Sequence, residues 1–371
     1  MRERSVHLAA GHRRPSRRPE ASAGPLSEPA LATRWRRRDL GTRLRPRLEP
    51  SMSEETNRLR YFPITLLPTV MGLTGLSIVF FKLQHVLHLD VPLGPGLLYF
   101  CTAWFGFLLV MYAVKFVRYR EELVEEFRHP IRVNFFPAIS ISFLLLAIGY
   151  LENGDLGLAR VLWWIGAPLH LVLLLVILGG WFHKAYHIHS FNPAWFIPVV
   201  GPLIVPVAGV QVAHPEISWF FFATGLMYWV FLQSVLTNRI FFHDPLPEKL
   251  LPTLFILIAP PAVGFIAYVK LSGDLDVFAK LLFYFGVFSV LMLLTMVDRF
   301  RRVPYFVSWW GYTFPLDAFT LSLYLMYMKT QAPLAKWAAL TMTGVTTLVI
   351  LVVAVKTVQV ASRGGICVPE K

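Results

Sequence analysis

The chain has 371 residues, of which 56% are hydrophobic and 15% are charged, and its formal net charge is +13 at pH 7. A soluble globular domain has about a quarter of its residues charged, whereas apolar runs of 18 or more residues recur here from about Tyr61 to Lys356, each long enough to cross a bilayer as a helix. Composition therefore excludes a soluble enzyme and predicts an all-α polytopic membrane protein.

Residues 1–51 contain 13 Lys and Arg against 5 Asp and Glu, so most of the excess positive charge lies in this segment. The segment is rich in Pro, Ser and Ala and has no hydrophobic period, which predicts a disordered basic tail. Met52 opens a second plausible start, and this favours the interpretation that residues 1–51 are upstream sequence outside the native protein. An Arg-rich targeting peptide and a tail that binds anionic lipid or nucleic acid are the alternatives.

Apolar length and charged or Pro/Gly-rich breaks divide the rest of the chain into ten predicted membrane spans. The connections after the second, fourth, sixth and eighth spans carry 11 Lys and Arg, and the opposite side carries 6. The positive-inside rule then predicts a multi-pass protein of the inner (plasma) membrane with both termini in the cytoplasm. The ten spans are residues 61–86, 95–118, 134–151, 159–182, 193–212, 216–237, 251–271, 277–299, 307–328 and 333–358.

These spans define the predicted domain organisation. Residues 52–60 form a short cytoplasmic N-terminus, residues 61–358 form the ten-helix transmembrane domain, and residues 359–371 form a cytoplasmic C-terminal tail.

Proline is concentrated in the odd-numbered spans, and Pro168 is the only proline in the interior of an even one. Because proline bends a helix and the freed carbonyl must find protein or water rather than lipid, kinked helices belong inside the bundle. The pattern predicts five helical hairpins around a central pore, with odd helices inside and even helices outside. The prolines of the odd spans are Pro63, Pro68, Pro137, Pro193, Pro198, Pro202, Pro206, Pro252, Pro260, Pro261 and Pro315.

The predicted inner helices contain hydroxyl and amide side chains but almost no charge, which argues for passive conduction rather than a charged relay. Kinked helix ends and hydroxyl donors favour anions. Phe314 lies in the middle of the ninth span directly before Pro315, where its ring can close a narrow pore by bulk and by dewetting. The other pore-lining candidates are Thr69, Gly72, Thr74, Phe136, Pro137, Ser140, Pro198, Pro202, Pro260, Pro261, Thr313 and Pro315.

Asp317 is the main charged exception within the inner spans. Two interpretations stay open for this residue, because its carboxyl group can be held by backbone or hydroxyl partners in a bent helix, or it can be a titratable group on the permeation path.

Features of enzymes are weak in this sequence. Two cysteines, Cys101 and Cys367, cannot form a disulfide framework or a four-thiolate metal site. His183 and His187 share a face if the fourth helix continues, and with His189 they could bind a metal, but a solvated loop cluster is the favoured interpretation. The sequence predicts no catalytic residue, no metal, no cofactor, no nucleic-acid partner and no enzymatic activity.

Five segments, taken in order over ten spans, resemble the tellurite-resistance/dicarboxylate transporter family, which includes TehA-type proteins and the plant slow-type anion channels. The resemblance extends from about Phe62 to Val358. The segments that carry it are Pro68–Leu76, His129–Ser140, Asn192–Pro193, Ile258–Pro261 and Trp309–Leu316.

The resemblance implies a homotrimer in the lipid bilayer in which each protomer has its own pore, lined by the five odd helices and closed by a phenylalanine in the ninth. Phe314 matches that gate, and chloride and nitrate are the expected permeant anions. Since some family members export malate or sulfite, the alternative is a proton-coupled exporter of dicarboxylate, sulfite or tellurite with Asp317 as its titratable group. A metal-dependent membrane enzyme at the histidine cluster is the third hypothesis.

Overall fold

A computed structural model describes residues 58–368, so the predictions for residues 1–51 fall on a segment outside the described part of the chain. Residues 58–368 form helices and turns without a strand. Within this part, nine helical segments are long and apolar enough to span a membrane. The remaining predicted span, the ninth at residues 307–328, contains α12 (Thr313–Thr330), which includes Asp317 and several hydroxyl side chains. These helices confirm an all-α polytopic membrane protein.

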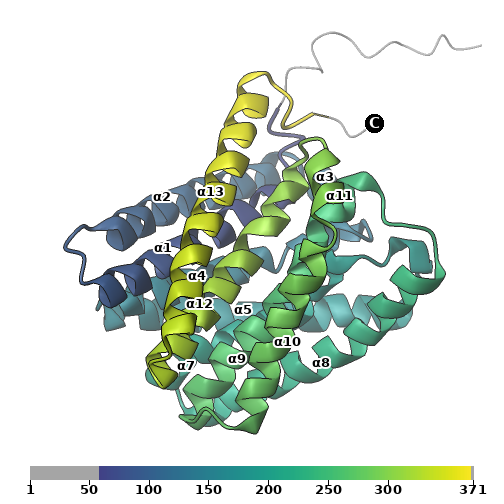
Figure 1. Ribbon diagram of the computed structural model, residues 1–371. Coiled ribbons are helices and arrows are strands. Elements are labelled where there is room, and N and C mark those ends of the chain that lie inside the picture. The colour runs from purple at the N-terminus through teal and green to yellow at the C-terminus, as the bar shows by residue number, and fades with distance from the viewer. Residues whose placement is uncertain (1–57, 369–371) are drawn as a thin grey trace, which may run out of the picture. The chain divides into compact units, whose positions relative to one another are not determined.

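Successive membrane spans pair as antiparallel hairpins, of which α12 and α13 are the clearest example (Figure 1). Three helices outside these pairs, α3 (Arg120–Arg128), α6 (Phe196–Val200) and α11 (Val297–Arg302), lie in connections or within a span. The pairs are α1 (Pro68–Leu87) with α2 (Leu93–Arg118), α4 (Ala138–Glu152) with α5 (Leu156–His183), α7 (Val205–Val212) with α8 (Pro215–Phe242), α9 (Ala259–Ser272) with α10 (Val277–Leu294), and α12 with α13 (Pro333–Ser362).

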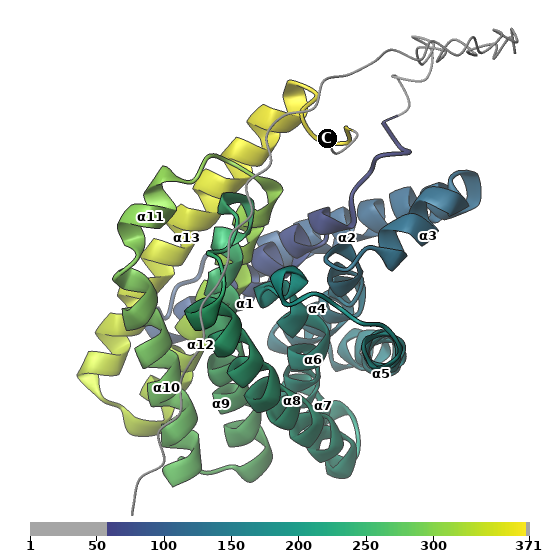
Figure 2. The same cartoon turned by 90° about the vertical axis from the view of Figure 1, so that its right-hand side faces the viewer.

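The first member of each hairpin belongs to a closed inner ring. Helix α1 packs against α4, α4 against α7, α7 against α9, α9 against α12, and α12 against α1. Burial separates the two sets: 72–89% of the most apolar stretch is buried in the first, third, fifth and seventh spans, against 28–39% in the even ones. Figure 2 shows α10 and α13 on the outside of this ring. The alternation predicted from proline positions therefore matches the arrangement of the helices.

Every inner span begins with 3-10 helix and continues as α-helix, and prolines lie at the transitions. Pro68 is the first residue of α1, and Pro260 and Pro261 follow the first residue of α9. A proline fits the first turn of an α-helix because the N–H that it lacks has no partner there. The 3-10 segments are η1 (Ile64–Leu66), η2 (Arg132–Phe135), η4 (Pro193–Trp195), η5 (Gly201–Ile204), η6 (Glu248–Ile258) and η7 (Val307–Tyr312).

The inner helices all run in the same direction, from a basic face to a far face. We define the basic face as the end of the bundle that holds residues 58–63, residues 363–368 and the connections after α2, α5, α8 and α10. Gly364 lies beside Arg58 at this face, so the two ends of the described chain meet there. The far face holds the last residues of the inner helices, among them Glu152, Ser272 and Thr330.

Close backbone approach fixes α1 against α12. A Cβ atom added to Gly75 would lie 2.5 Å from Asp317 Oδ2, and one added to Gly72 would overlap the side chain of Thr313. Small residues at such crossings let membrane helices pack tightly. This contact brings the start of α12, and with it Phe314, against the inner ring.

Candidate functional site

Two cavities lie inside the inner ring, and each is bordered by residues of all five inner spans. The larger has a volume of about 460 Å³ and extends to the basic face, and the smaller has a volume of about 90 Å³ and extends toward the far face. Among residues 58–368, only Ile204 and Phe314 border both cavities. The two cavities therefore follow one axis through the bundle, and the side chains of these two residues lie between them.

Phe314 is the second residue of α12, and its side chain is only partly buried although its neighbours Thr313 and Pro315 are buried. Ile204 ends η5, directly before the last helical segment of the fifth span. An apolar pair at the narrowest point of an axial path can block it by bulk and by excluding water. The sequence analysis singled out Phe314 but not Ile204, because an isoleucine in an apolar span carries no signal of its own.

Most pore-lining candidates other than Phe314 do not border either cavity. Two of them form hydrogen bonds elsewhere. Thr69 accepts a hydrogen bond from Trp104 Nε1 on α2 at 2.8 Å, and Thr313 donates to the carbonyl of Trp310 at 2.8 Å. Of the candidates, Phe314 and Pro315 border the larger cavity. Those that border neither cavity are Thr69, Gly72, Thr74, Phe136, Pro137, Ser140, Pro198, Pro202, Pro260, Pro261 and Thr313.

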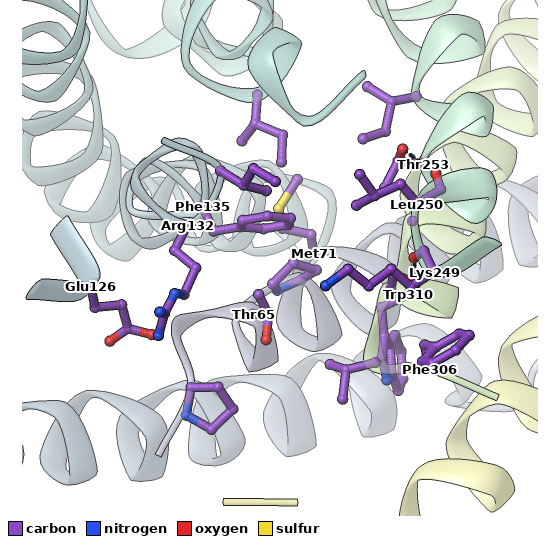
Figure 3. Close-up of a pocket in the computed structure, with 18 of the residues that line it drawn as sticks. Thr65, Met71, Glu126, Arg132, Phe135, Lys249, Leu250, Thr253, Phe306 and Trp310 are labelled. Atoms are coloured by element: carbon purple, nitrogen blue, oxygen red, sulfur yellow. Dashed lines mark hydrogen bonds between the residues drawn. The ribbon is translucent and has the colours of Figure 1, made fainter. Parts of the chain in front are cut away.

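The wall of the larger cavity is formed largely by the 3-10 segments and by the first turns of the α-helices. Figure 3 shows Thr65, Met71, Phe135, Thr253 and Trp310 around it, together with Lys249, which extends inward from the start of η6. Because the α-helices of the inner ring begin here, their positive ends point toward this cavity.

A buried ion pair supports one side of the larger cavity. Lys115 Nζ donates to Glu126 Oε2 at 2.8 Å and to the carbonyl of Phe62 at 2.6 Å, and both charged side chains are less than 5% exposed. The other carboxylate oxygen of Glu126 accepts from the backbone N–H of Ile64 at 2.8 Å. These contacts join α2 and α3 to the start of the first inner span. The sequence analysis did not single out Lys115.

Two cations of the larger cavity have no ion-pair partner within residues 58–368. They are Arg132, whose Nε atom is buried without a hydrogen bond in that range, and Lys249. Two other cations are balanced, because Arg60 pairs with Glu122 at 2.5 Å and Lys115 pairs with Glu126. The cavity therefore has an excess of positive charge that can attract anions.

Asp317 is completely buried and faces α1 at Gly75. Neither carboxylate oxygen has a hydrogen-bond partner in the described part of the chain, and the residue borders neither cavity. The structure thus places Asp317 in the contact between α1 and α12, one residue before Ala318, which does border the smaller cavity.

His170 on α5 holds the broken fifth span in place. Its Nε2 donates to the carbonyl of Pro198 at 3.0 Å, and its Nδ1 lies 2.9 Å from Ser140 Oγ on α4. The imidazole is fully buried, and a Cβ atom at Gly201 would overlap it. The sequence analysis did not single out His170, but this residue connects two inner spans beside η5, which carries Ile204.

The histidine cluster does not form the shared helical face that metal binding requires. Helix α5 ends at His183 and the backbone is extended at Lys184 and His187, so the premise of a continuing helix is wrong. His183 Nδ1 is 2.6 Å from the carbonyl of Gly179. Among residues 58–368 no group of three or more His, Cys, Asp or Glu is placed to hold a metal ion.

Comparison with known proteins agrees with this architecture. Residues 61–358 match the SLAC1 family, described as voltage-dependent anion channel. The S-type anion channel SLAH2 of Arabidopsis thaliana is 30% identical over 300 residues, which cover 79% of this chain and 58% of that protein. An uncharacterised transporter of Methanocaldococcus jannaschii is 26% identical, with 72% and 86% covered, and a tellurite resistance protein TehA homologue of Haemophilus influenzae is 25% identical, with 72% and 80% covered.

The chain spans about half the length of two of the plant channels that it matches, 58% of SLAH2 and 48% of SLAH3. The match to the family nevertheless covers all ten spans, including the whole lining of the smaller cavity, most of the lining of the larger one, and the two residues between them. The chain therefore belongs to the SLAC1 family of voltage-dependent anion channels.

Proposed function

We propose that the protein is an anion channel that conducts small monovalent anions such as chloride and nitrate along the axis of each protomer, with Phe314 as the gate. The observation that carries this proposal is the pair of cavities that share Phe314 and Ile204 inside a closed ring of five helices. Rotation of the Phe314 ring away from the axis joins the cavities into a continuous path.

The charges support anions over cations. Arg132 and Lys249 give the larger cavity an excess of positive charge, and the positive ends of the inner helices point toward it. A cation pathway usually presents carbonyl oxygens or acidic rings instead. The relatives named S-type anion channel agree with this charge pattern.

The proposed setting is the inner (plasma) membrane, with the basic face and both termini in the cytoplasm, as the positive-inside rule requires. The outer helices expose many large apolar side chains, such as Phe231, Leu281 and Leu348. These surfaces suit contact with lipid and with the neighbouring subunits of a homotrimer. Conduction needs no catalytic residue or cofactor, which agrees with a family of channels and transporters.

The position of Asp317 supports a channel over a proton-coupled exporter of dicarboxylate, sulfite or tellurite. A coupling carboxylate must exchange protons with the path that the substrate follows. Asp317 faces Gly75 instead and lies outside the lining of both cavities. We expect Asp317→Asn to leave transport independent of a proton gradient.

Voltage-clamp recordings in symmetric and then asymmetric chloride or nitrate test the proposal. Phe314→Ala should give a large current whose reversal potential follows the anion gradient and ignores the cation gradient. A well-folded Phe314→Ala protein at the membrane with no anion current would overturn the channel assignment and favour the coupled exporter.

A further inference from the structure

Charged side chains gather at the far rim of the smaller cavity, beyond its apolar walls. Lys82 near the end of α1, Glu152 at the end of α4 and Lys270 near the end of α9 all border this cavity. The rest of its lining is apolar, for example Ile148, Val263 and Leu325. An anion that has passed Phe314 therefore meets its next polar partners only at this rim.

Glu152 neutralises only one of the lysines. Lys82 Nζ donates to Glu152 Oε2 at 2.5 Å, and the two side chains are 21% and 24% exposed. Lys270 has no ion-pair partner in the described part of the chain, and it interacts electrostatically with Lys82, Glu152 and Lys329. The rim therefore carries more positive than negative charge.

Asp276, another acidic residue near this end, has partners of its own. Asp276 caps α10 by accepting from the backbone N–H of Ala279 at 2.9 Å, and it also accepts from the hydroxyl of Tyr268 at 2.6 Å. Lys329 Nζ donates to the carbonyl of Gly273 at 2.5 Å. The side chains of Asp276, Tyr268 and Lys329 do not border the cavity. Its charged lining residues are Lys82, Lys270 and Glu152.

The electrostatics of the far face give these lysines a role on an anion path. The inner helices end here, so their negative ends face the rim and disfavour an anion. A cavity of about 90 Å³ has room for roughly three water-sized molecules at about 30 Å³ each, so an anion inside it keeps little of its hydration. Amines at the rim offset both costs.

We propose that Lys82 and Lys270 form a second anion-binding site at the far end of the pathway, and that the carboxylate of Glu152 occupies Lys82 as a tethered competitor of the permeating anion. The ligand class is small inorganic monovalent anions. The inference rests on the proposed channel function and adds a binding site to it.

The test uses the full-length protein with Phe314→Ala, so that the gate does not limit the current. Adding Lys270→Gln should lower the anion current by about threefold or more at low ionic strength, with a smaller effect in high salt because exposed charges are screened. Adding Glu152→Gln should raise the current, since Lys82 is then free to bind the anion. Lys270→Arg should restore the current.

Lys280→Gln is the matched control, because Lys280 is an exposed lysine of α10 that does not border the cavity. If Lys280→Gln and Lys270→Gln lower the anion current equally, the effect comes from general surface charge. That outcome would overturn the site. Unchanged currents in both Lys270→Gln and Glu152→Gln would overturn it as well.

A second measurement separates this site from the channel proposal. Nitrate binding is measured by the melting temperature of the detergent-solubilised protein in sodium nitrate against sodium gluconate of equal ionic strength, because a ligand that binds the folded state raises it. The rise should be the same in the wild type and in Lys280→Gln and smaller in Lys270→Gln, where only the larger cavity still attracts nitrate. That result without any anion current would support the site while the channel proposal fails, and a rise in Lys270→Gln equal to that of the wild type would overturn the site.

Discussion

The two cavities differ in the secondary structure that surrounds them. The larger is bordered by 3-10 segments such as η2 and η7 and by connections of the basic face, whereas the smaller is bordered mainly by regular α-helix from α1, α4, α9 and α12. A 3-10 helix is more tightly wound than an α-helix, so the ring leaves more space where its members are 3-10. The path narrows where α-helix resumes, and Phe314 lies at that transition.

The cavities also differ in how charge is held. Near the larger cavity, Glu126 and Lys115 are buried and bind the backbone, so they stabilise the wall. At the rim of the smaller cavity, Lys82 and Glu152 are partly exposed, and solvent weakens the contribution of such a pair to stability. Substitutions should therefore change folding at the first pair and transport at the second.

The largest expected effect is on stability, at the larger cavity. Glu126→Gln leaves the buried ammonium group of Lys115 without its counter-charge, and breaking a buried ion pair in this way costs about 3–5 kcal/mol. Thermal unfolding of the detergent-solubilised protein measures the loss. Glu125→Gln is the matched control, because Glu125 is the preceding residue of α3 and is exposed. If the two variants unfold alike, the buried pair does not stabilise the wall.

The next effect removes the barrier between the cavities. Phe314→Ala should raise the anion current by about a hundredfold, which corresponds to lowering the barrier by about 2.7 kcal/mol. Phe135→Ala is the control, because it removes the same ring from the wall of the larger cavity only and should leave the current unchanged. A similar increase in both variants would mean that width in general, rather than the position between the cavities, limits the current.

A smaller effect on stability is expected at the broken fifth span. His170→Ala leaves the carbonyl of Pro198 and the hydroxyl of Ser140 without this partner, and an unsatisfied buried polar group costs about 1–3 kcal/mol. The melting temperature should fall. Because η5 carries Ile204, the anion current of the protein with Phe314 intact should change as well. His183→Ala, at the exposed end of the same helix, should have neither effect. A His170→Ala protein with wild-type stability would remove the role assigned to this histidine.

The helical bundle could be predicted from the sequence because its physical signals are strong and local. Apolar length locates a membrane span to within a few residues, as the second span (Leu93–Arg118) and the fifth (Pro193–Val212) illustrate. Proline shows which helices are inside, because a kinked helix exposes backbone that lipid cannot satisfy. Both signals act within one helix and need no knowledge of its neighbours.

The lining of the pathway could not be predicted from the same signals. Thr69 and Ser140 are polar and lie on inner spans, but they turn toward Trp104 and His170 rather than toward the axis. Which side of a helix faces the axis depends on its rotation against its neighbours, and hydroxyl groups satisfy partners on any side. Ile204 shows the reverse case, because an apolar residue borders the axis without any sequence signal.

The smallest expected effect concerns Ile204. It decides whether the barrier between the cavities is formed by Phe314 alone or by Phe314 together with Ile204. Ile204→Ala should raise the anion current about threefold, equivalent to about 0.65 kcal/mol, because it removes a shorter side chain than Phe314→Ala and leaves the ring in place. Ile266→Ala is the matched control, since Ile266 borders only the smaller cavity, and it should leave the current unchanged.

Combining Ile204→Ala with Phe314→Ala completes this test. If the two side chains close the path against each other, the double variant should conduct no more than Phe314→Ala alone, because either truncation removes their contact and effects within one contact are not additive. If the increases multiply instead, Ile204 limits the current at a separate step, and the barrier between the two cavities is then the phenylalanine ring alone.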